Sequence, residues 1–126
     1  MEARQTDTGH ALTPTGLFRL LGDETRLRAV VLLNRRGELC VCELTEALGV
    51  SQPKMSRHLA TLRDNGLVET RRSGQWIHYQ LRGDRPEWLR TTLNAICESL
   101  ADQAPHADDV RHVTRAIARN RSECES

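Results

Sequence analysis

Apolar side chains recur at three- and four-residue spacings over most of this chain, which predicts a mainly helical protein. Helices are expected where leucine, valine and alanine form one stripe, over residues 14–21, 24–33, 40–48, 51–65, 86–100 and 107–118. Thr13, Asp23 and Ser51 precede three of these stripes and are typical N-cap residues. Gly22 and Gly49 are expected to end helices. The pattern therefore divides the chain into short helices joined by tight turns.

A run of strand-forming residues predicts one pair of strands in the middle of the chain. The segments 67–72 and 75–81 flank Ser73-Gly74, which indicates a β-hairpin. If Arg72 faces Gln75 across this loop, one face of the hairpin is expected to pack inward. That face carries Val68, Thr70, Ile77 and Tyr79.

Helix, glycine-containing turn, helix and hairpin follow one another in the order of a winged helix-turn-helix. We therefore expect a mainly α fold with a small β-hairpin, built as a single domain from residues 1–126. The polar ends, about 1–12 and about 119–126, are expected to be flexible tails. Helix 86–100 carries a narrow apolar seam, which needs a partner in the first helix or in a second subunit. The seam consists of Leu89, Leu93, Ile96 and Leu100.

The helix over 51–65 is the candidate DNA-reading element, because a single helix fits the major groove. Residues 51–85 carry seven basic and three acidic side chains, a net charge of +4 in a chain whose total is +1. Hydroxyl, amide and cationic groups of the kind that contact bases and phosphates lie in its first turns. They are Ser51, Gln52, Lys54, Ser56, Arg57 and His58, and the hairpin adds Arg71 and Arg72.

The composition of the chain also predicts its cellular compartment. No apolar run reaches the roughly 18 residues that a membrane helix needs, and the first residues, MEARQTDTGHALT, lack an apolar signal core. The chain is therefore expected in the cytoplasm, without a membrane partner. The four cysteines are expected to be reduced there, which favours soft-ion binding or thiol chemistry over disulfides.

Cys40 and Cys42 stand at the start of the expected helix-turn-helix. Residues i and i+2 of a helix point about 200° apart, whereas in an extended segment they share one face. Chelation of one ion by both thiolates therefore requires non-helical backbone here. Cys40-Val41-Cys42-Glu43 also has the spacing of a capping box, with cysteine in the place of serine or threonine. We expect ligand binding to unwind or redirect this first turn and thereby shift helix 51–65.

From Leu20 to Leu81 the chain resembles the ArsR-type metal- and metalloid-responsive repressors. The matching segments are LGDETRLRAVVLL, ELCVCELTEALGVSQPKMSRHLATLRDNGLV and RRSGQWIHYQL. The segment ELCVCEL is similar to the arsenic-responsive branch, whose members carry a CVC signature. The zinc-sensing branch needs D-x-H and H-x-x-E patterns, and the cadmium- and lead-sensing branch needs N-terminal cysteines. This sequence has neither.

The resemblance implies a homodimer that represses an operator in double-stranded DNA and releases it when arsenite or antimonite binds. It implies Cys40 and Cys42 as ligands of the effector and no required cofactor. The best-known signature has a third cysteine three residues further on, where this chain has Thr45. A third sulfur ligand would have to come from Cys97, from Cys124 or from the other subunit.

Three alternatives follow from the same cysteines. A thiol redox- or electrophile-sensing winged-helix repressor would use Cys40 and Cys42 without a metalloid. A thiol-based enzyme is disfavoured, because the motif is C-x-C rather than C-x-x-C and no βαβ pattern surrounds it. A structural zinc site is disfavoured by the lack of an obvious second pair of ligands. We therefore expect a regulator and not an enzyme.

Overall fold

The helices and strands of this computed structural model follow the expected order, with one additional strand. The structure describes residues 12–125, and side chains up to residue 121. The elements are α1 (Pro14–Leu21), α2 (Glu24–Arg36), β1 (Glu38–Cys40), α3 (Val41–Leu48), α4 (Gln52–Asp64), β2 (Val68–Ser73), β3 (Trp76–Leu81), α5 (Glu87–Leu100) and α6 (His106–Glu125). The expected tail at 1–12 lies almost entirely outside the described residues. The mainly helical fold with a small sheet is confirmed.

The helix ends follow the local chemistry of the sequence. The side chains of Thr13, Asp23 and Ser51 accept hydrogen bonds from the backbone of the helices that they precede, as expected for N-caps. Gly49 ends α3 in the left-handed conformation, with φ of 68°. This sharp turn, together with the cap at Ser51, fixes the angle at which α4 leaves α3.

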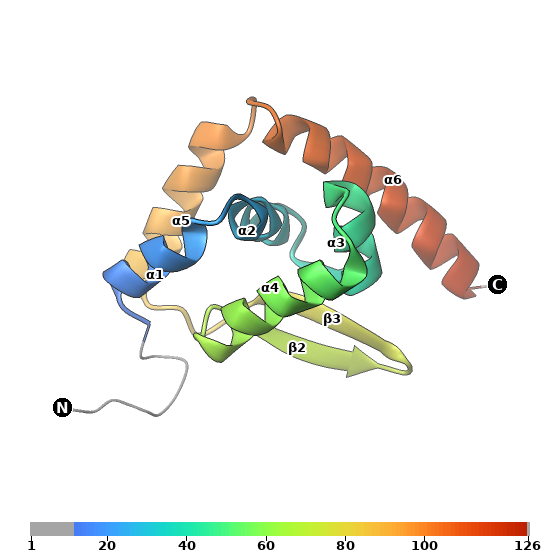
Figure 1. Cartoon of the computed structure of the whole chain (residues 1–126), viewed down its shortest axis with the longest axis horizontal. Helices are drawn as coiled ribbons and strands as arrows, with labels where there is room; N and C mark the ends of the chain where they lie inside the picture. Colours follow the sequence, from blue (N-terminus) through green and yellow to red (C-terminus); the bar gives the residue numbers. More distant parts are fainter. Residues whose placement is uncertain (1–11, 126) are drawn as a thin grey trace.

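Helix α2 lies at the centre of the molecule, with the other helices around it (Figure 1). Leu32 of α2 is fully buried. Met55, Leu59 and Leu62 are also fully buried, which confirms the apolar face expected for α4. Because this face is held in the core, the opposite face of α4 is left for solvent or a ligand.

The sheet has three antiparallel strands in the order β1-β3-β2. The register of the hairpin differs by two residues from the expected one, because Ser73 faces Trp76 and the loop is Gly74-Gln75, with φ of 62° at Gly74. A shift of two keeps the same residues on each face. Only the base of the expected inner face is buried, since Val68 and Tyr79 are buried whereas Thr70 and Ile77 are exposed.

The two C-terminal helices also differ from the expected pattern. The buried stripe of α5 is Leu89, Leu93 and Cys97, and Ile96 and Leu100 of the expected seam are only half-buried. Helix α6 continues to Glu125 instead of ending at residue 118, so most of the segment expected to be a tail is helical. It packs along α2 and α3 (Figure 1), and these contacts compensate for its polar sequence.

An ion pair fixes the first half of α6 to the central helix. The Arg28 guanidinium of α2 donates two hydrogen bonds, of 2.9 and 2.8 Å, to the carboxylate of Asp109. Asp109 is 2% exposed, so its charge depends on this one partner.

Of the helices described between residues 12 and 125, none is long and apolar enough to cross a membrane.

Candidate DNA interface and thiol site

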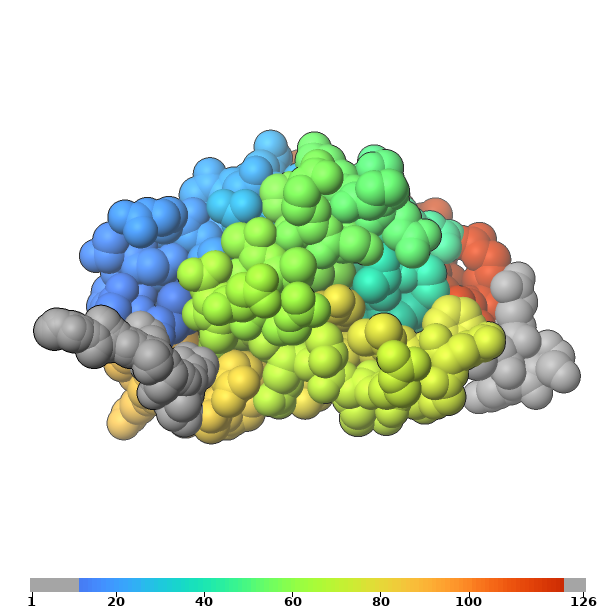
Figure 2. All heavy atoms as spheres, turned by 60° about the horizontal axis from the view of Figure 1, so that its bottom comes forward, coloured from blue at the N-terminus to red at the C-terminus, as the bar shows by residue number. Residues whose placement is uncertain are grey.

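Helices α3 and α4 and the turn between them form a helix-turn-helix, and the hairpin β2-β3 follows it as the wing. Figure 2 shows α4 and the wing together on one face of the molecule. On the first turns of α4, Gln52, Lys54 and Arg57 are exposed, whereas Ser56 is half-buried. Ser51 is exposed, and its hydroxyl caps α4 through the Lys54 N–H at 3.4 Å. Most of the residues expected to read DNA are therefore exposed to solvent at the start of α4.

His58 lies elsewhere on α4 and contacts the start of α2. Its Nδ1 is 3.3 Å from Arg26 Nη1, and its Nε2 is 3.7 Å from an oxygen of Asp23. Burial, reinforced by the charge of Arg26, lowers the pKa of His58, although Asp23 opposes this effect. His58 therefore connects α4 to the helix that supports it.

The two arginines of the wing have different surroundings. Arg71 donates hydrogen bonds of 2.8 and 2.7 Å to both carboxylate oxygens of Glu38 on β1. Arg72 is exposed. Among the described residues no ion-pair partner of Arg72 is found. Arg72 is therefore the wing cation that is free to meet a phosphate.

Replacement of Arg72 by alanine is expected to weaken binding to specific and non-specific DNA by similar factors. If Arg72 contacts one phosphate, the slope of log affinity against log salt concentration should fall by about 1 in this variant. Arg71→Ala is the matched control, since its charge is already neutralised by Glu38. Salt titrations by fluorescence anisotropy measure both slopes, and equal changes would contradict this assignment.

Cys40 and Cys42 form a thiol pair that straddles the start of α3. Cys40 ends β1 with extended backbone, φ −87° and ψ 166°, and is the N-cap residue, while Cys42 lies in the first helical turn. Both sulfurs contact the side-chain amide of Asn120 on α6, at 3.5 Å for Cys42 and 3.7 Å for Cys40. Burial, followed by the neighbouring Cys42 thiol, raises the pKa of Cys40 to about 12. The backbone is thus extended at Cys40 but helical from Val41 onward, so the non-helical backbone expected for chelation is present at only one of the two cysteines.

A capping box with cysteine is present, as expected, and Glu43 is its acidic member. The carboxylate of Glu43 accepts the Cys40 N–H at 3.0 Å. Glu43 is 1% exposed, and Arg121 of α6 donates to it at 3.1 Å. Although burial opposes ionisation, the hydrogen bond from Arg121 and the one from the Cys40 backbone hold the pKa of Glu43 below its usual value. The start of α3 therefore contains a buried carboxylate, that of Glu43, whose negative charge is balanced by Arg121.

The residues of α6 that complete this site were not predicted from the sequence. Asn120 accepts a hydrogen bond from the Cys42 thiol at 3.5 Å, and its amide nitrogen lies 3.7 Å from the sulfur of Cys40. A signal was present in the sequence, because Val113, Ala116, Ile117 and Asn120 follow a helical spacing that continues past residue 118. This spacing extends the helix and places Asn120 on its inner face.

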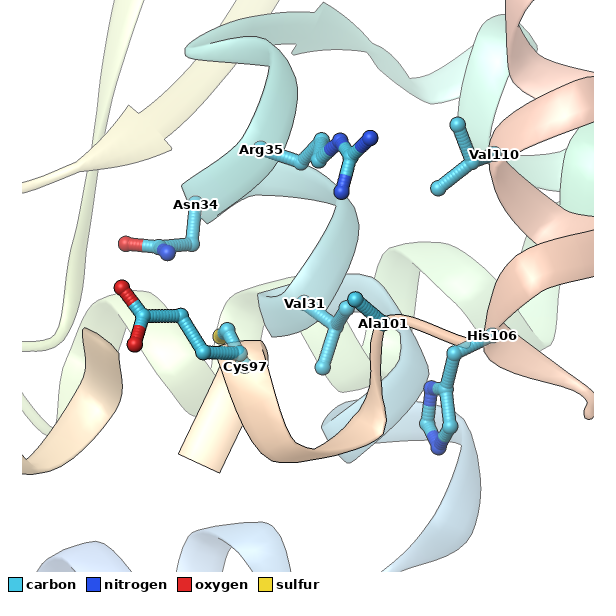
Figure 3. Close-up of a pocket in the computed structure, with 8 residues that line it drawn as sticks. Val31, Asn34, Arg35, Cys97, Ala101, His106 and Val110 are labelled. Atoms are coloured by element: carbon cyan, nitrogen blue, oxygen red, sulfur yellow. The ribbon is translucent and has the colours of Figure 1, made fainter. Parts of the chain in front are cut away.

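In the part of the chain that the structure describes, Cys97 does not complete a metal-binding group with Cys40 and Cys42. Within the described residues, no three His, Cys, Asp or Glu side chains group closely enough to hold a metal ion. The Thr45 hydroxyl donates to the carbonyl groups of Val41 and Cys42. Cys97 lies in a pocket of about 120 Å³ between α2, α5 and α6, which Figure 3 shows with His106 at its edge. The side chain of Cys124 lies outside the described residues.

Comparison with known proteins gives the family. Residues 23–70 match the family model described as bacterial regulatory protein, arsR family. An arsenic resistance transcriptional regulator of Pseudomonas putida is 47% identical over 102 residues, which are 79% of this chain and 80% of that protein. The arsenical resistance operon repressor of Escherichia coli is 50% identical over 95 residues, 74% of this chain and 81% of that one.

A solved structure with the same architecture is that of reduced HlyU from Vibrio cholerae. It has 35% sequence identity and a TM-score of 0.56, and the match covers 71% of this chain and 85% of that one. The match therefore leaves more than a quarter of this chain outside the shared fold. With its helix-turn-helix, its wing and these relatives, the chain belongs to the arsR family of bacterial regulatory proteins.

Proposed function

We propose that this chain is the transcriptional repressor of an arsenic-resistance system, and that trivalent arsenic or antimony releases it from its operator by binding Cys40 and Cys42. The observation that carries the proposal is the thiol pair at the first turn of the helix-turn-helix, where one side-chain amide, that of Asn120, contacts both sulfurs at 3.5 and 3.7 Å. Relatives named as arsenic-resistance regulators support the biological context. The chain acts on DNA in the cytoplasm and is not an enzyme.

The chemistry of binding is a ligand exchange at arsenic. Arsenite, As(OH)₃, exchanges two hydroxide groups for the two cysteine sulfurs, and the two thiol hydrogens leave with these hydroxides as two water molecules. The product has two As–S bonds and one remaining As–OH, so no oxidant or reductant is consumed. Antimonite reacts in the same way. Two protein thiols are therefore sufficient for a chelate, with Thr45 in place of a third cysteine.

The location of the pair explains how binding reaches the DNA interface. Two bonds to one arsenic atom change the geometry of Cys40, which is the N-cap of α3, and of Cys42 in its first turn. Helix α3 is connected to α4 by the short turn at Gly49. A preference of about 100-fold for the altered state corresponds to roughly 2.7 kcal/mol of coupling. Coupling of this size lowers the operator affinity of the effector-bound protein by the same factor.

A homodimer completes the proposal, because two reading helices are needed for a two-fold operator. Helices α1 and α5 both pack on α2 and carry exposed aromatic side chains, Phe18 at 57% and Trp88 at 36%. Ile96 and Leu100 of α5 are half-buried. An isolated chain exposes these side chains to water, whereas a second copy would cover them.

Operator binding in the presence of different effectors tests the proposal. Under reducing conditions, arsenite and antimonite should lower operator affinity about 100-fold, because each forms a chelate with both thiols. Zinc and cadmium should have little effect, since no third nitrogen, sulfur or carboxylate ligand joins the pair among the described residues. Release by peroxide without release by arsenite would instead support the redox-sensing alternative.

A further inference from the structure

One side chain of the C-terminal helix contacts both sulfurs of the thiol pair. The Cys42 thiol donates to Asn120 Oδ1 at 3.5 Å, and Asn120 Nδ2 donates toward Cys40 Sγ at 3.7 Å and to Glu43 at 3.3 Å. The end of α6 runs along α3 (Figure 1), and the two helices pack together. Asn120 therefore accepts the thiol hydrogen of Cys42, which arsenic replaces when it binds. Asn120 also donates to a lone pair of the Cys40 sulfur, which arsenic uses to form its bond.

The next residue on α6 holds the same turn by charge. Arg121 pairs with the carboxylate of Glu43 and also donates to the backbone oxygen of Glu38 at 3.3 Å. Since Glu43 is almost completely buried, its charge needs this partner. Asn120 and Arg121, which together we call the clasp, thus fix the end of α6 to the start of the helix-turn-helix.

We infer that the clasp is part of the switch, with Asn120 as a positioning residue that links occupancy of the thiol pair to the docking of α6. The inference rests on the proposed function. A sulfur bound to arsenic carries no hydrogen, so Cys42 cannot donate to Asn120 Oδ1 once the chelate has formed. The docked clasp therefore belongs to the ligand-free, operator-binding state, and the ligand binds better when the clasp is open.

Only the end of α6 needs to move in this scheme. Its first half is fixed by the ion pair between Arg28 and Asp109 and by Val113 and Ala116, which are fully buried. Beyond them, Asn120 is half-buried and Arg121 is exposed. A pocket of about 230 Å³ between this end of α6 and the wing is lined by Asn120 and Arg121, so the clasp borders open space on one side.

Removal of the Asn120 amide should move the two affinities in opposite directions. Full-length Asn120→Ala is expected to bind arsenite about fivefold more tightly and, without arsenite, to bind operator about fivefold more weakly, the size expected for one hydrogen bond. If the clasp favours the operator-binding state, thermodynamic linkage requires the affinities for arsenite and for operator to change in opposite directions. Asn120→Leu removes the amide but keeps its volume and should give the same directions. His112→Ala, on the exposed face of α6, is the matched control and should change neither affinity.

Isothermal titration with arsenite and anisotropy with operator measure the two affinities. A purely structural role of Asn120 would weaken both, and that result would overturn the inference. So would unchanged affinities in both Asn120 variants while the wild-type protein still responds to arsenite. If arsenite does not release the wild-type protein, the proposed function itself is wrong, and the inference is wrong with it.

Discussion

Cys42→Ser and Cys40→Ser variants are expected to bind operator like the wild-type protein and to ignore arsenite. One remaining thiol cannot form a chelate, so the drop in operator affinity caused by arsenite should shrink from about 100-fold to less than about threefold. DNA binding should survive because neither cysteine lies on the exposed face of α4. Serine is also a better N-cap than cysteine, so Cys40→Ser should not weaken the start of α3.

Cys97→Ser is the control for this pair of variants. Cys97 lies in the pocket between α2, α5 and α6 (Figure 3), and among the described residues it forms no metal-binding group with Cys40 and Cys42. Its replacement should leave the arsenite response intact. If both Cys40→Ser and Cys42→Ser still released operator normally, the effector site would lie elsewhere in the protein.

Arg28→Ala is expected to lower the free energy of unfolding by about 3 kcal/mol. The variant leaves the carboxylate of Asp109, which is 2% exposed, without its bidentate partner. This value lies at the lower end for a broken buried ion pair, because Arg28 keeps 20% of its own side-chain surface in water. Urea denaturation followed by circular dichroism measures the change.

Two further variants separate the ion pair from a general effect of charge. Arg63→Ala breaks an exposed pair with Asp64 and should cost less than about 1 kcal/mol. The double variant Arg28→Met with Asp109→Leu replaces the buried charges by apolar side chains and should recover most of the loss. Equal losses in Arg28→Ala and Arg63→Ala would contradict the role given to Asp109.

The elements that local chemistry determines could be predicted from the sequence. Caps at Thr13, Asp23 and Ser51, the left-handed turn at Gly49 and the apolar face of α4 depend on residues a few positions apart. The thiol pair could be located for the same reason, since its spacing and its capping box lie within four consecutive residues. Periodicity and capping were therefore sufficient for the helix-turn-helix.

Long-range contacts account for what sequence analysis missed. Strand β1 has only three residues and exists because β3, about forty residues later, pairs with it. The contacts of His58 with Asp23 and of Arg71 with Glu38 are also between distant segments. The expected tail after residue 118 is helical because Asn120 and Arg121 find partners on α3. Apart from the helical spacing that continues to Asn120, none of these pairings has a signal within the local sequence.

The structure changes the expectation of what happens around the thiols when a ligand binds. Sequence spacing required non-helical backbone for a chelate, and an unwound first turn was expected on binding. Cys40 has extended backbone while α3 begins normally at Val41, and the sulfurs of Cys40 and Cys42 both contact the Asn120 amide. The change on binding is therefore expected in the contacts around the pair, above all those of Asn120 and Glu43, before any change in the helix itself.

The most direct test of the account is a titration of the operator-bound protein with arsenite under reducing conditions, in which released DNA and protein-bound arsenic are measured on the same sample. Release should rise in step with arsenic bound, and X-ray absorption should show two sulfur neighbours per arsenic atom in the wild-type protein. Release of DNA without bound arsenic, or binding of arsenic that persists in Cys40→Ser and Cys42→Ser, would contradict the account.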